Sequence, residues 1–543
     1  MPRSIAPFFL FLTVTVAMAT PARAQQHDHS VATGKVGSVH FQTSCRAEAQ
    51  PAFDRAVALL HSFEFPYAIE GFESVLKADP SCAMAEWGIA MSRWGNPFSP
   101  SPRTPAVLQA GATAVAQARA LGAKTPREQG YVDAVAKLFT DAATIDHRTR
   151  VVAYRDAMTA LAAAQPADTE ATIFTALSLA AAAPPADKTY ADQLKAGAML
   201  EGLIAAQPDH PGLAHYIIHA YDVPPLADRA LAAARRYATI APVAPHALHM
   251  PSHTFTRVGA WQESIDTNIA SGDAARREGS ASEELHALDY RTYAYLQTAQ
   301  DAAARQMVDA LTGIRTRFDA TRSGSTAPSS TALFAFAAIP ARFALERGDW
   351  AAAAALTPQP SPYAFADAVT WYAKAIGAAR SGDAAGTRAA MDALAGLKAK
   401  LVEQKETYWA EQAEIQRSAA AAWLAFVEGR RDEGLTGLRA AADLEDRTEK
   451  AAVTPGPLMP AREQVGDMLL EMKRPAEALQ AFEATLKKEP NRFRALAGAS
   501  RAAALAGDTA KARRYGDDLA KICVKADGPV RPELAEARKL AAK

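Results

Sequence analysis

The chain lacks an excess of charge of either sign. It carries 59 acidic and 59 basic residues, its formal net charge is +0, and no basic stripe stands out. A nucleic-acid partner therefore has little support, because such proteins present clustered positive charge. Aromatic residues are scarce at 8%, whereas hydrophobic residues reach 49% and alanine is abundant. Small apolar side chains suit closely packed helices, so the composition favours an all-α protein.

After Ala24, the sequence also lacks an apolar run long enough to span a membrane. The segment over 1–24 reads as an export signal: Arg3 precedes an apolar run over 8–16, and a small-residue stretch ends at Ala24. We therefore expect cleavage after Ala24 and a soluble mature protein in the periplasm or outside the cell. The cleavage site has no cysteine, which argues against a lipid anchor.

Cysteine is nearly absent, with three in the chain. Cys45 precedes the first helical pattern and Cys82 opens the second unit, so a disulfide between them would hold the amino-terminal cap in an oxidising compartment. Cys523 lies in the apolar stripe of the last helix pair and would remain unpaired. Three free buried thiols are the alternative.

At 543 residues, the chain is too long for one compact core, and it contains an internal repeat. Two segments have a small residue, an aromatic residue and a proline at relative positions 0, 4 and 12. They are Ala68, Phe72 and Pro80 and, near the carboxyl end, Ala478, Phe482 and Pro490. Glycine turns that close one helix before the next begins recur at Gly259, Gly348, Gly382, Gly429 and Gly507. These signals predict consecutive helix pairs.

On these residues the chain resembles tetratricopeptide repeat proteins from about Phe53 to Ile522. It also resembles exported bacterial repeat proteins that carry the phrases CAMAEWGIAMS, HALHMPSH and VTPGPLMPAREQ. The resemblance implies an all-α solenoid of stacked helix pairs, wound as a right-handed superhelix. Its concave channel would be lined mainly by the first helix of each pair. The resemblance implies no established reaction.

The breaks in these patterns divide the chain into eight segments. We expect a signal peptide over 1–24, a polar tail over 25–48, amino-terminal helical repeats over 49–208, central histidine-rich repeats over 209–318, a loop over 319–330, helical repeats with irregular connections over 331–458, a carboxyl-terminal tetratricopeptide pair over 459–524 and a capping tail over 525–543.

Seven of the twelve histidines fall between residues 210 and 286. His215 and His219 are four residues apart, as are His249 and His253, so each pair would share one helical face. The second pair follows the first by 34 residues, which is the tetratricopeptide period. The two pairs should therefore occupy equivalent places on neighbouring repeats.

Counting from the turn at Gly259 extends this register to other side chains. By analogy with tetratricopeptide proteins, the counted positions point into the concave channel. They are His246, His249 and His253 in one unit, His215, His219 and Asp222 in the unit before, and His286, Asp289 and Tyr293 in the unit after. Pro251 lies within the helix that carries His249 and His253 and should kink it.

This pattern suits a divalent metal such as zinc, copper or iron. Two histidines one turn apart can bind one ion together, so His215, His219, His249 and His253 would complete a four-ligand shell. Asp222 or Asp289 would add a fifth ligand or fix the imidazole tautomers. The alternative is that the histidines are hydrogen-bonding spacers between packed helices. Arg257 and Asn268 are candidates for supporting groups, with ordinary helix packing favoured.

Three classes of function remain open. The leading hypothesis is an exported scaffold that binds a protein, a peptide or a small ligand in its channel. A metal-dependent enzyme and a structural adaptor are the alternatives. The sequence has no metalloprotease helix motif, nucleophile elbow or phosphate-binding glycine loop, which speaks against a recognisable catalytic centre. His27 and His29 offer a weaker copper or nickel site in the tail, where disorder is the favoured interpretation.

Overall fold

The computed structural model describes Met1 and residues 30–99, 101–321 and 327–542. The expected signal peptide, the cleavage site after Ala24, and His27 and His29 lie outside the described residues. Across the described part of the chain no helix is long and apolar enough to cross a membrane.

Helices make up the fold, and the described residues contain no strand beyond an isolated bridge between Gln300 and Asp527. The amino-terminal helices are α1 (Ser30–Thr33), α2 (Gln50–His61), α3 (Phe65–Ala78), α4 (Ala83–Trp94), α5 (Pro105–Leu121), α6 (Pro126–Ala136), α7 (His147–Ala164), α8 (Thr169–Ala182) and α9 (Ala191–Ile204). The central helices are α10 (Pro211–Ala220), α11 (Leu231–Ile240), α12 (Pro245–His249), α13 (Pro251–Val258), α14 (Trp261–Arg277), α15 (Ala281–Gln297) and α16 (Asp301–Arg315). The carboxyl-terminal helices are α17 (Ser329–Glu346), α18 (Trp350–Ala355), α19 (Ala364–Arg380), α20 (Ala384–Glu403), α21 (Thr407–Val427), α22 (Arg431–Asp446), α23 (Ala461–Glu471), α24 (Pro475–Lys488), α25 (Phe493–Leu505), α26 (Thr509–Ile522) and α27 (Pro532–Ala541).

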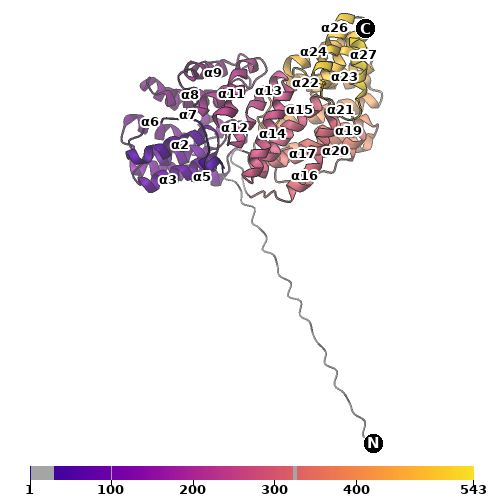
Figure 1. Cartoon of the computed structure of the whole chain (residues 1–543). Coiled ribbons are helices and arrows are strands. Elements are labelled where there is room, and N and C mark those ends of the chain that lie inside the picture. The colour runs from indigo at the N-terminus through magenta and orange to yellow at the C-terminus, as the bar shows by residue number, and fades with distance from the viewer. Residues whose placement is uncertain (2–29, 100, 322–326, 543) are drawn as a thin grey trace.

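Successive helices pack as pairs along the molecule, from the indigo end to the yellow end in Figure 1. Phe72 on α3 is fully buried, and a Cβ atom on Gly88 of α4 would lie 2.3 Å from its ring. Phe482 on α24 packs in the same way against Gly466 and Gly498 of the flanking helices. The aromatic residue of the repeat therefore fills space that the neighbouring glycine leaves open. This packing confirms the predicted all-α solenoid of tetratricopeptide-type helix pairs.

The predicted glycine turns are present between the helices. Gly259 closes α13 with φ of +69°, and a Cβ atom there would lie 2.4 Å from the Pro490 carbonyl oxygen. A side chain at this position is therefore excluded both by the left-handed backbone and by the close approach of a distant repeat. Positive φ angles are also found at Gly348, Gly382, Gly429 and Gly507.

Near the amino terminus, a disulfide joins Cys45 to Cys82, the residue that precedes α4. Cys523 is a buried free thiol after α26. The described apolar side chains form one core up to Phe255, a second around α14 to α17, and a third in the carboxyl-terminal half. Helices α12 and α13 lie where the first two cores meet.

The carboxyl-terminal repeats return to the centre of the chain. The indole nitrogen of Trp261 donates to the Asn491 carbonyl oxygen at 2.8 Å, and Arg531 forms an ion pair with Asp301. Helix α27 packs on α26 and α25, in the segment expected to cap the array. Each of the two contacts joins positions that are 230 apart in the sequence, so the central and last repeats are held together.

A loop over 447–460, which joins α22 to α23, lies between the central helices and the carboxyl-terminal half. The buried Arg342 of α17 donates to the carbonyl oxygens of Gly456 and Pro457 and to Thr454 Oγ1. Its Nε also bonds Asp289 Oδ1 of α15 at 2.8 Å. One guanidinium therefore fixes the loop to two helices.

We predict that Arg342→Ala lowers the free energy of unfolding by about 3–5 kcal/mol, because it leaves the Asp289 carboxylate buried and unpaired. Urea denaturation followed by far-UV circular dichroism measures the change. Arg347→Ala is the matched control, since Arg347 is 31% exposed and its ion pairs with Asp301 and Asp349 span 3.7 and 4.0 Å. Equal losses from the two variants would contradict the anchoring role of Arg342.

Candidate functional site

The predicted histidines come together in one buried cluster at the centre of the molecule. His215 and His219 lie on α10, His246 and His249 on α12, His253 on α13 and His286 on α15. Their exposed fractions run from 0% to 8%. This differs from the expectation that they line an open channel. The loop 447–460 and the ring of Phe98, which stacks on His219 at 4.0 Å between centroids, lie against the cluster.

Pro251 divides the helix that carries the second histidine pair. Helix α12 ends at His249 and α13 begins at Pro251, with Met250 between them in helical geometry. Because proline has no N–H, residue 251 cannot donate to the Ala247 carbonyl oxygen. Two residues later, the His253 amide donates to the Met250 carbonyl oxygen. The imidazole rings of His249 and His253 then meet with their Nε2 atoms 3.2 Å apart.

The cluster consists of two triads rather than the predicted four-histidine shell. Each triad brings one ring nitrogen from each member to within 4.8 Å of the others. The first triad is His215, His219 and His246, and the second triad is His249, His253 and His286. Each predicted pair thus gains a third histidine from another helix, His246 or His286. The triads are adjacent, since the rings of His219 and His253 have centroids 6.0 Å apart.

Hydrogen bonds define the tautomers in the second triad. His249 Nδ1 lies 2.8 Å from Asn268 Oδ1, and the Asn268 amide group donates to the Ser264 carbonyl oxygen, so its oxygen faces His249. His249 therefore carries its proton on Nδ1. His253 Nδ1 lies 2.9 Å from Asp222 Oδ2 and likewise donates. A neutral imidazole has one N–H, so both Nε2 atoms present lone pairs to each other.

The two facing lone pairs have little to satisfy them within the described structure. The hydroxyl of Tyr290 is 3.3 Å from His253 Nε2, but it also lies 3.0 Å from the Ala452 and 3.1 Å from the Thr454 carbonyl oxygen. The Tyr290 hydroxyl has one proton and can donate fully to only one of these three acceptors. The third member, His286, has a buried Nδ1 with no hydrogen-bond partner in the described part of the chain. The second triad is therefore rich in unused electron pairs.

Asp222 connects the second triad to two cations. Arg257 Nε donates to its Oδ1 at 2.8 Å, and Lys450 Nζ lies 3.3 Å from its Oδ2. Burial raises the pKa of Asp222, but Lys450 and Arg257 outweigh that effect and hold the pKa well below its usual range. Burial lowers the pKa of Lys450 to about 8, although Asp222 opposes the change. The carboxylate is thus ionised and ready to accept from His253.

The first triad is organised by one strong contact. His215 Nδ1 lies 2.6 Å from the His61 carbonyl oxygen and must donate to it, so its Nε2 is an acceptor. That atom is 3.1 Å from His246 Nε2. His246 Nδ1 and His219 Nε2 are buried and have no hydrogen-bond partner among the described residues.

A third group, which the sequence interpretation missed, is joined through a shared carboxylate, although His210 Nδ1 is buried with no hydrogen-bond partner among the described residues. The Glu170 carboxylate accepts from His61 Nε2 at 3.0 Å and from His210 Nε2 at 2.8 Å, and His61 Nδ1 contacts the Tyr216 hydroxyl. The two histidines hold the pKa of Glu170 below its usual range although burial raises it. These residues form a buried hydrogen-bonded bridge between α2, α8 and α10. His61 and Glu170 lie outside the histidine-rich stretch, so no spacing pointed to them.

Two of the predicted ligand-binding residues belong to another network. Asp289 pairs with Arg342, and the Tyr293 hydroxyl accepts from Arg492 Nη1 at 3.0 Å. Both side chains are buried on α15. Tyr290 is the residue of α15 that reaches the histidines besides His286.

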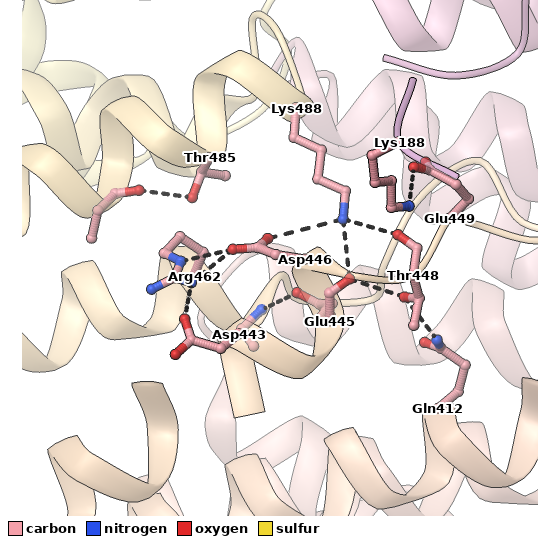
Figure 2. Close-up of polar contacts among 12 residues, drawn as sticks. Lys188, Gln412, Asp443, Glu445, Asp446, Thr448, Glu449, Arg462, Thr485 and Lys488 are labelled. Carbon is pink, nitrogen blue, oxygen red and sulfur yellow. Dashed lines mark hydrogen bonds and ion pairs between the residues drawn. The ribbon is translucent and has the colours of Figure 1, made fainter. Parts of the chain in front are cut away.

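A small pocket of about 60 Å³, partly open to solvent, adjoins the two cations that pair with Asp222. Arg257 and Lys450 form part of its lining, and the stacked rings of Phe365 and Trp409 form another part. Figure 2 shows its polar side, where Lys488 Nζ donates to the carbonyl oxygens of Glu445 and Thr448. The pocket thus combines aromatic surface with charged groups. Glu449, also in the lining, pairs with Lys188 and joins the loop to the amino-terminal half.

Comparison with known proteins identifies no family for this chain. No family model and no curated protein matches it. Among solved structures, it is similar to the human IFIT1 dimer with m7Gppp-AAAA, at 10% identity and a TM-score of 0.34 over 82% of this chain and 90% of that one. The P58(IPK) TPR domain is 14% identical, with a TM-score of 0.21 over 69% of this chain and 98% of that one. The structure of Naa15/Naa10 bound to HypK-THB is 11% identical, with a TM-score of 0.24 over 91% of this chain and 91% of that one. We draw no functional conclusion from these likenesses.

Glu445 in the pocket lining predicts how the free energy of unfolding depends on pH. Burial raises the pKa of Glu445 to about 7, although Lys488 and the Ala461 amide oppose the change. Between the ordinary pKa of 4.5 and about 7, the native state holds a proton that the unfolded chain has released. Stability contributed by this group is therefore complete below pH 4.5 and is lost as the pH rises through about 7.

Glu445→Gln should remove this slope, because the amide keeps an acceptor for the Ala461 N–H and does not ionise. Urea denaturation midpoints measured between pH 4.5 and about 7 test this expectation. Asp443→Asn is the control, because the Asp443 side chain is 67% exposed. The prediction fails if the Gln variant keeps the wild-type slope.

Proposed function

We propose that this protein is an exported helical scaffold whose second triad, His249, His253 and His286, binds a divalent late first-row metal ion. The observation that carries the proposal is the pair of facing Nε2 lone pairs at 3.2 Å, with both Nδ1 protons already engaged. A cation between the two nitrogens removes their repulsion. Histidine ligands held by a carboxylate or a carbonyl on the far nitrogen are typical of metal sites.

The distance between the nitrogens fits a metal ion. Two imidazole nitrogens at about 2.0–2.1 Å from one Zn²⁺ lie roughly 2.9–3.4 Å apart for bond angles between a right angle and the tetrahedral angle. His286 brings a third nitrogen to within 4.8 Å of the other two. Ligands made of imidazole alone favour zinc, copper, iron or nickel over magnesium or calcium.

A shared proton in place of a metal accounts less well for the geometry. It would place a positive charge on the buried ring of His249 or His253, and burial lowers the pKa of both groups. Burial, His286 and His253 hold the pKa of His249 well below its usual range, so a proton there is strongly disfavoured. Packing alone leaves the repulsion between the two lone pairs in place.

A scaffold role accompanies the metal site in this proposal. The helical array has the architecture of a protein-binding solenoid, and the pocket beside Arg257 and Lys450 offers a place for a short side chain of a bound peptide. Arg257 and Lys450 contact both the Asp222 carboxylate and the pocket. An occupant of the pocket would therefore act on the second triad through Asp222 and His253.

Export is part of the same proposal. The disulfide between Cys45 and Cys82 supports folding in an oxidising compartment, which agrees with an export signal over 1–24. The HALHMPSH phrase contributes His246, His249 and His253, so we group the chain with exported repeat proteins that carry this phrase. Sequencing the amino terminus of the secreted or periplasmic protein tests cleavage after Ala24.

A metal-dependent enzyme is the second candidate. Three histidine ligands leave a coordination position free, which is the arrangement of catalytic rather than structural zinc sites. The Tyr290 hydroxyl lies 3.3 Å from His253 Nε2 and would stand close to an ion held by this triad. The chemistry that a bound ion would supply is polarisation of a substrate oxygen or water.

We predict that protein purified without a histidine tag retains one zinc ion at the second triad after incubation with zinc and gel filtration. His253→Ala should abolish this binding, because the remaining nitrogens lose the partner oriented by Asp222. Elemental analysis measures the metal. His40→Ala is the control, since His40 has a side chain that is 74% exposed. Undiminished zinc in His253→Ala would rule out the site.

We further predict that Asn268→Ala weakens zinc binding by about 10–100-fold, because His249 loses the acceptor that holds its proton on Nδ1. Asn268→Asp, which keeps an acceptor oxygen, should restore most of the affinity. Competition with a zinc chelator measures both. Asp266→Ala on the exposed side of α14 controls for general effects on that helix. Equal affinity of the Ala and Asp variants would contradict the role in tautomer selection.

A further inference from the structure

The first triad has the same composition as the second and lies directly beside it. Helix α12 contributes His246 to one triad and His249 to the other, and the rings of these two residues have centroids 6.4 Å apart. His219 and His253 face each other across the same boundary at 6.0 Å. Any ion in one triad is therefore close to the nitrogens of the other.

Hydrogen bonding within the protein leaves the first triad unsatisfied. His215 donates through Nδ1 to the His61 carbonyl oxygen, so its Nε2 is a lone pair aimed at His246 Nε2, 3.1 Å away. If His246 donates to that lone pair, its own Nδ1 is a bare acceptor. His246 Nδ1 has no partner among the described residues, and neither has His219 Nε2. Each unmatched buried group costs about 1–3 kcal/mol.

The neighbouring His61, Glu170 and His210 group shows how this protein builds a structural histidine site. There each histidine donates to one oxygen of a shared carboxylate. No carboxylate of the described residues forms a hydrogen bond or ion pair with His215, His219 or His246. The first triad instead brings three imidazoles together without a carboxylate, and it leaves two buried nitrogens unpartnered where the Glu170 group leaves one, His210 Nδ1. This arrangement suits a cation and not a hydrogen-bonded bridge.

We propose that His215, His219 and His246 form a second metal site, so that the cluster holds two late first-row metal ions side by side. This inference rests on the proposed function of the second triad and extends it to a two-ion centre. Each ion has three imidazole ligands from neighbouring repeats. The carbonyl oxygen of His61 orients His215 as Asp222 and Asn268 orient the ligands of the second ion.

The charges around the cluster favour copper for this pair. Asp222 bonds one of the six rings, His253, and Arg257 and Lys450 already neutralise this carboxylate. Six neutral imidazoles add no negative charge, so two divalent ions would leave a large buried positive charge. Cuprous ions carry half that charge, and imidazole is among the ligands that suit copper. The two-ion centre therefore fits copper better than zinc.

The test is the number of copper ions per chain. Metal-free protein without a tag is loaded with Cu(I) under anaerobic conditions, passed through gel filtration and analysed for copper. His27→Ala and His29→Ala are included throughout, because the amino-terminal segment offers an independent copper site. We expect two copper ions in this background, one after His215→Ala, one after His253→Ala, and none when both are replaced.

Variants that preserve packing guard against misfolding. His219→Phe keeps a ring against Phe98, and His246→Phe keeps one against Phe63. Each should also lower the count to one while circular dichroism and the elution volume stay unchanged. A count of one that only His253→Ala abolishes would overturn the second site and leave the proposed function standing. A count of zero in the background protein would overturn both.

Electron paramagnetic resonance after oxidation to Cu(II) provides a second readout. Two neighbouring Cu(II) ions couple magnetically, so the background protein should show fewer spins per copper than His215→Ala or His253→Ala, each of which holds one isolated ion. Equal spins per copper in all three proteins would show that the ions are far apart and would contradict the two-ion centre.

Discussion

A neutral imidazole has one proton and one lone pair, and this constraint governs the centre of the protein. Eight histidines are buried there, on or beside helices α2, α10, α12, α13 and α15. Each buried donor needs an acceptor and each lone pair needs a donor or a cation. The His61 carbonyl oxygen, Asn268 and Asp222 each accept one Nδ1 proton, so three Nε2 lone pairs must find partners elsewhere.

Periodicity predicted the fold and most of the cluster. Local signals such as the glycine at 259 and the spacing of Ala68, Phe72 and Pro80 report on contacts within one or two helix pairs, which repeat along the chain. The two histidine pairs are separated by one repeat period, which predicted that they would lie on neighbouring repeats, because stacking places equivalent positions together. Their division into triads depends on ring orientation, which Pro251 and the hydrogen-bond partners determine and spacing does not.

The contacts of Lys450 and Tyr290 could not be predicted, for a different reason. Lys450 reaches Asp222 across 228 residues, and Tyr290 contacts carbonyl oxygens of the loop 162 and 164 residues away. Such contacts arise from the return of the carboxyl-terminal repeats to the centre, which no local pattern encodes. For the same reason Asp289 and Tyr293, placed correctly by register on α15, contact Arg342 and Arg492 instead of the histidines. The repeat register predicts which helix and which face carry a residue. The residues packed against that face determine its hydrogen-bond partner.

The loop 447–460 affects how fast an ion at the cluster would exchange with solvent. It contributes Lys450 beside Asp222, its backbone carbonyls accept from Tyr290, and Arg342 holds it to α17. Under the proposed function, an ion behind it exchanges with solvent only during local opening of the protein. Residence time is then set by the opening rate of a protein segment and not by the lability of metal–nitrogen bonds. A weakly bound ion in such a site would still be released slowly, which separates retention from affinity.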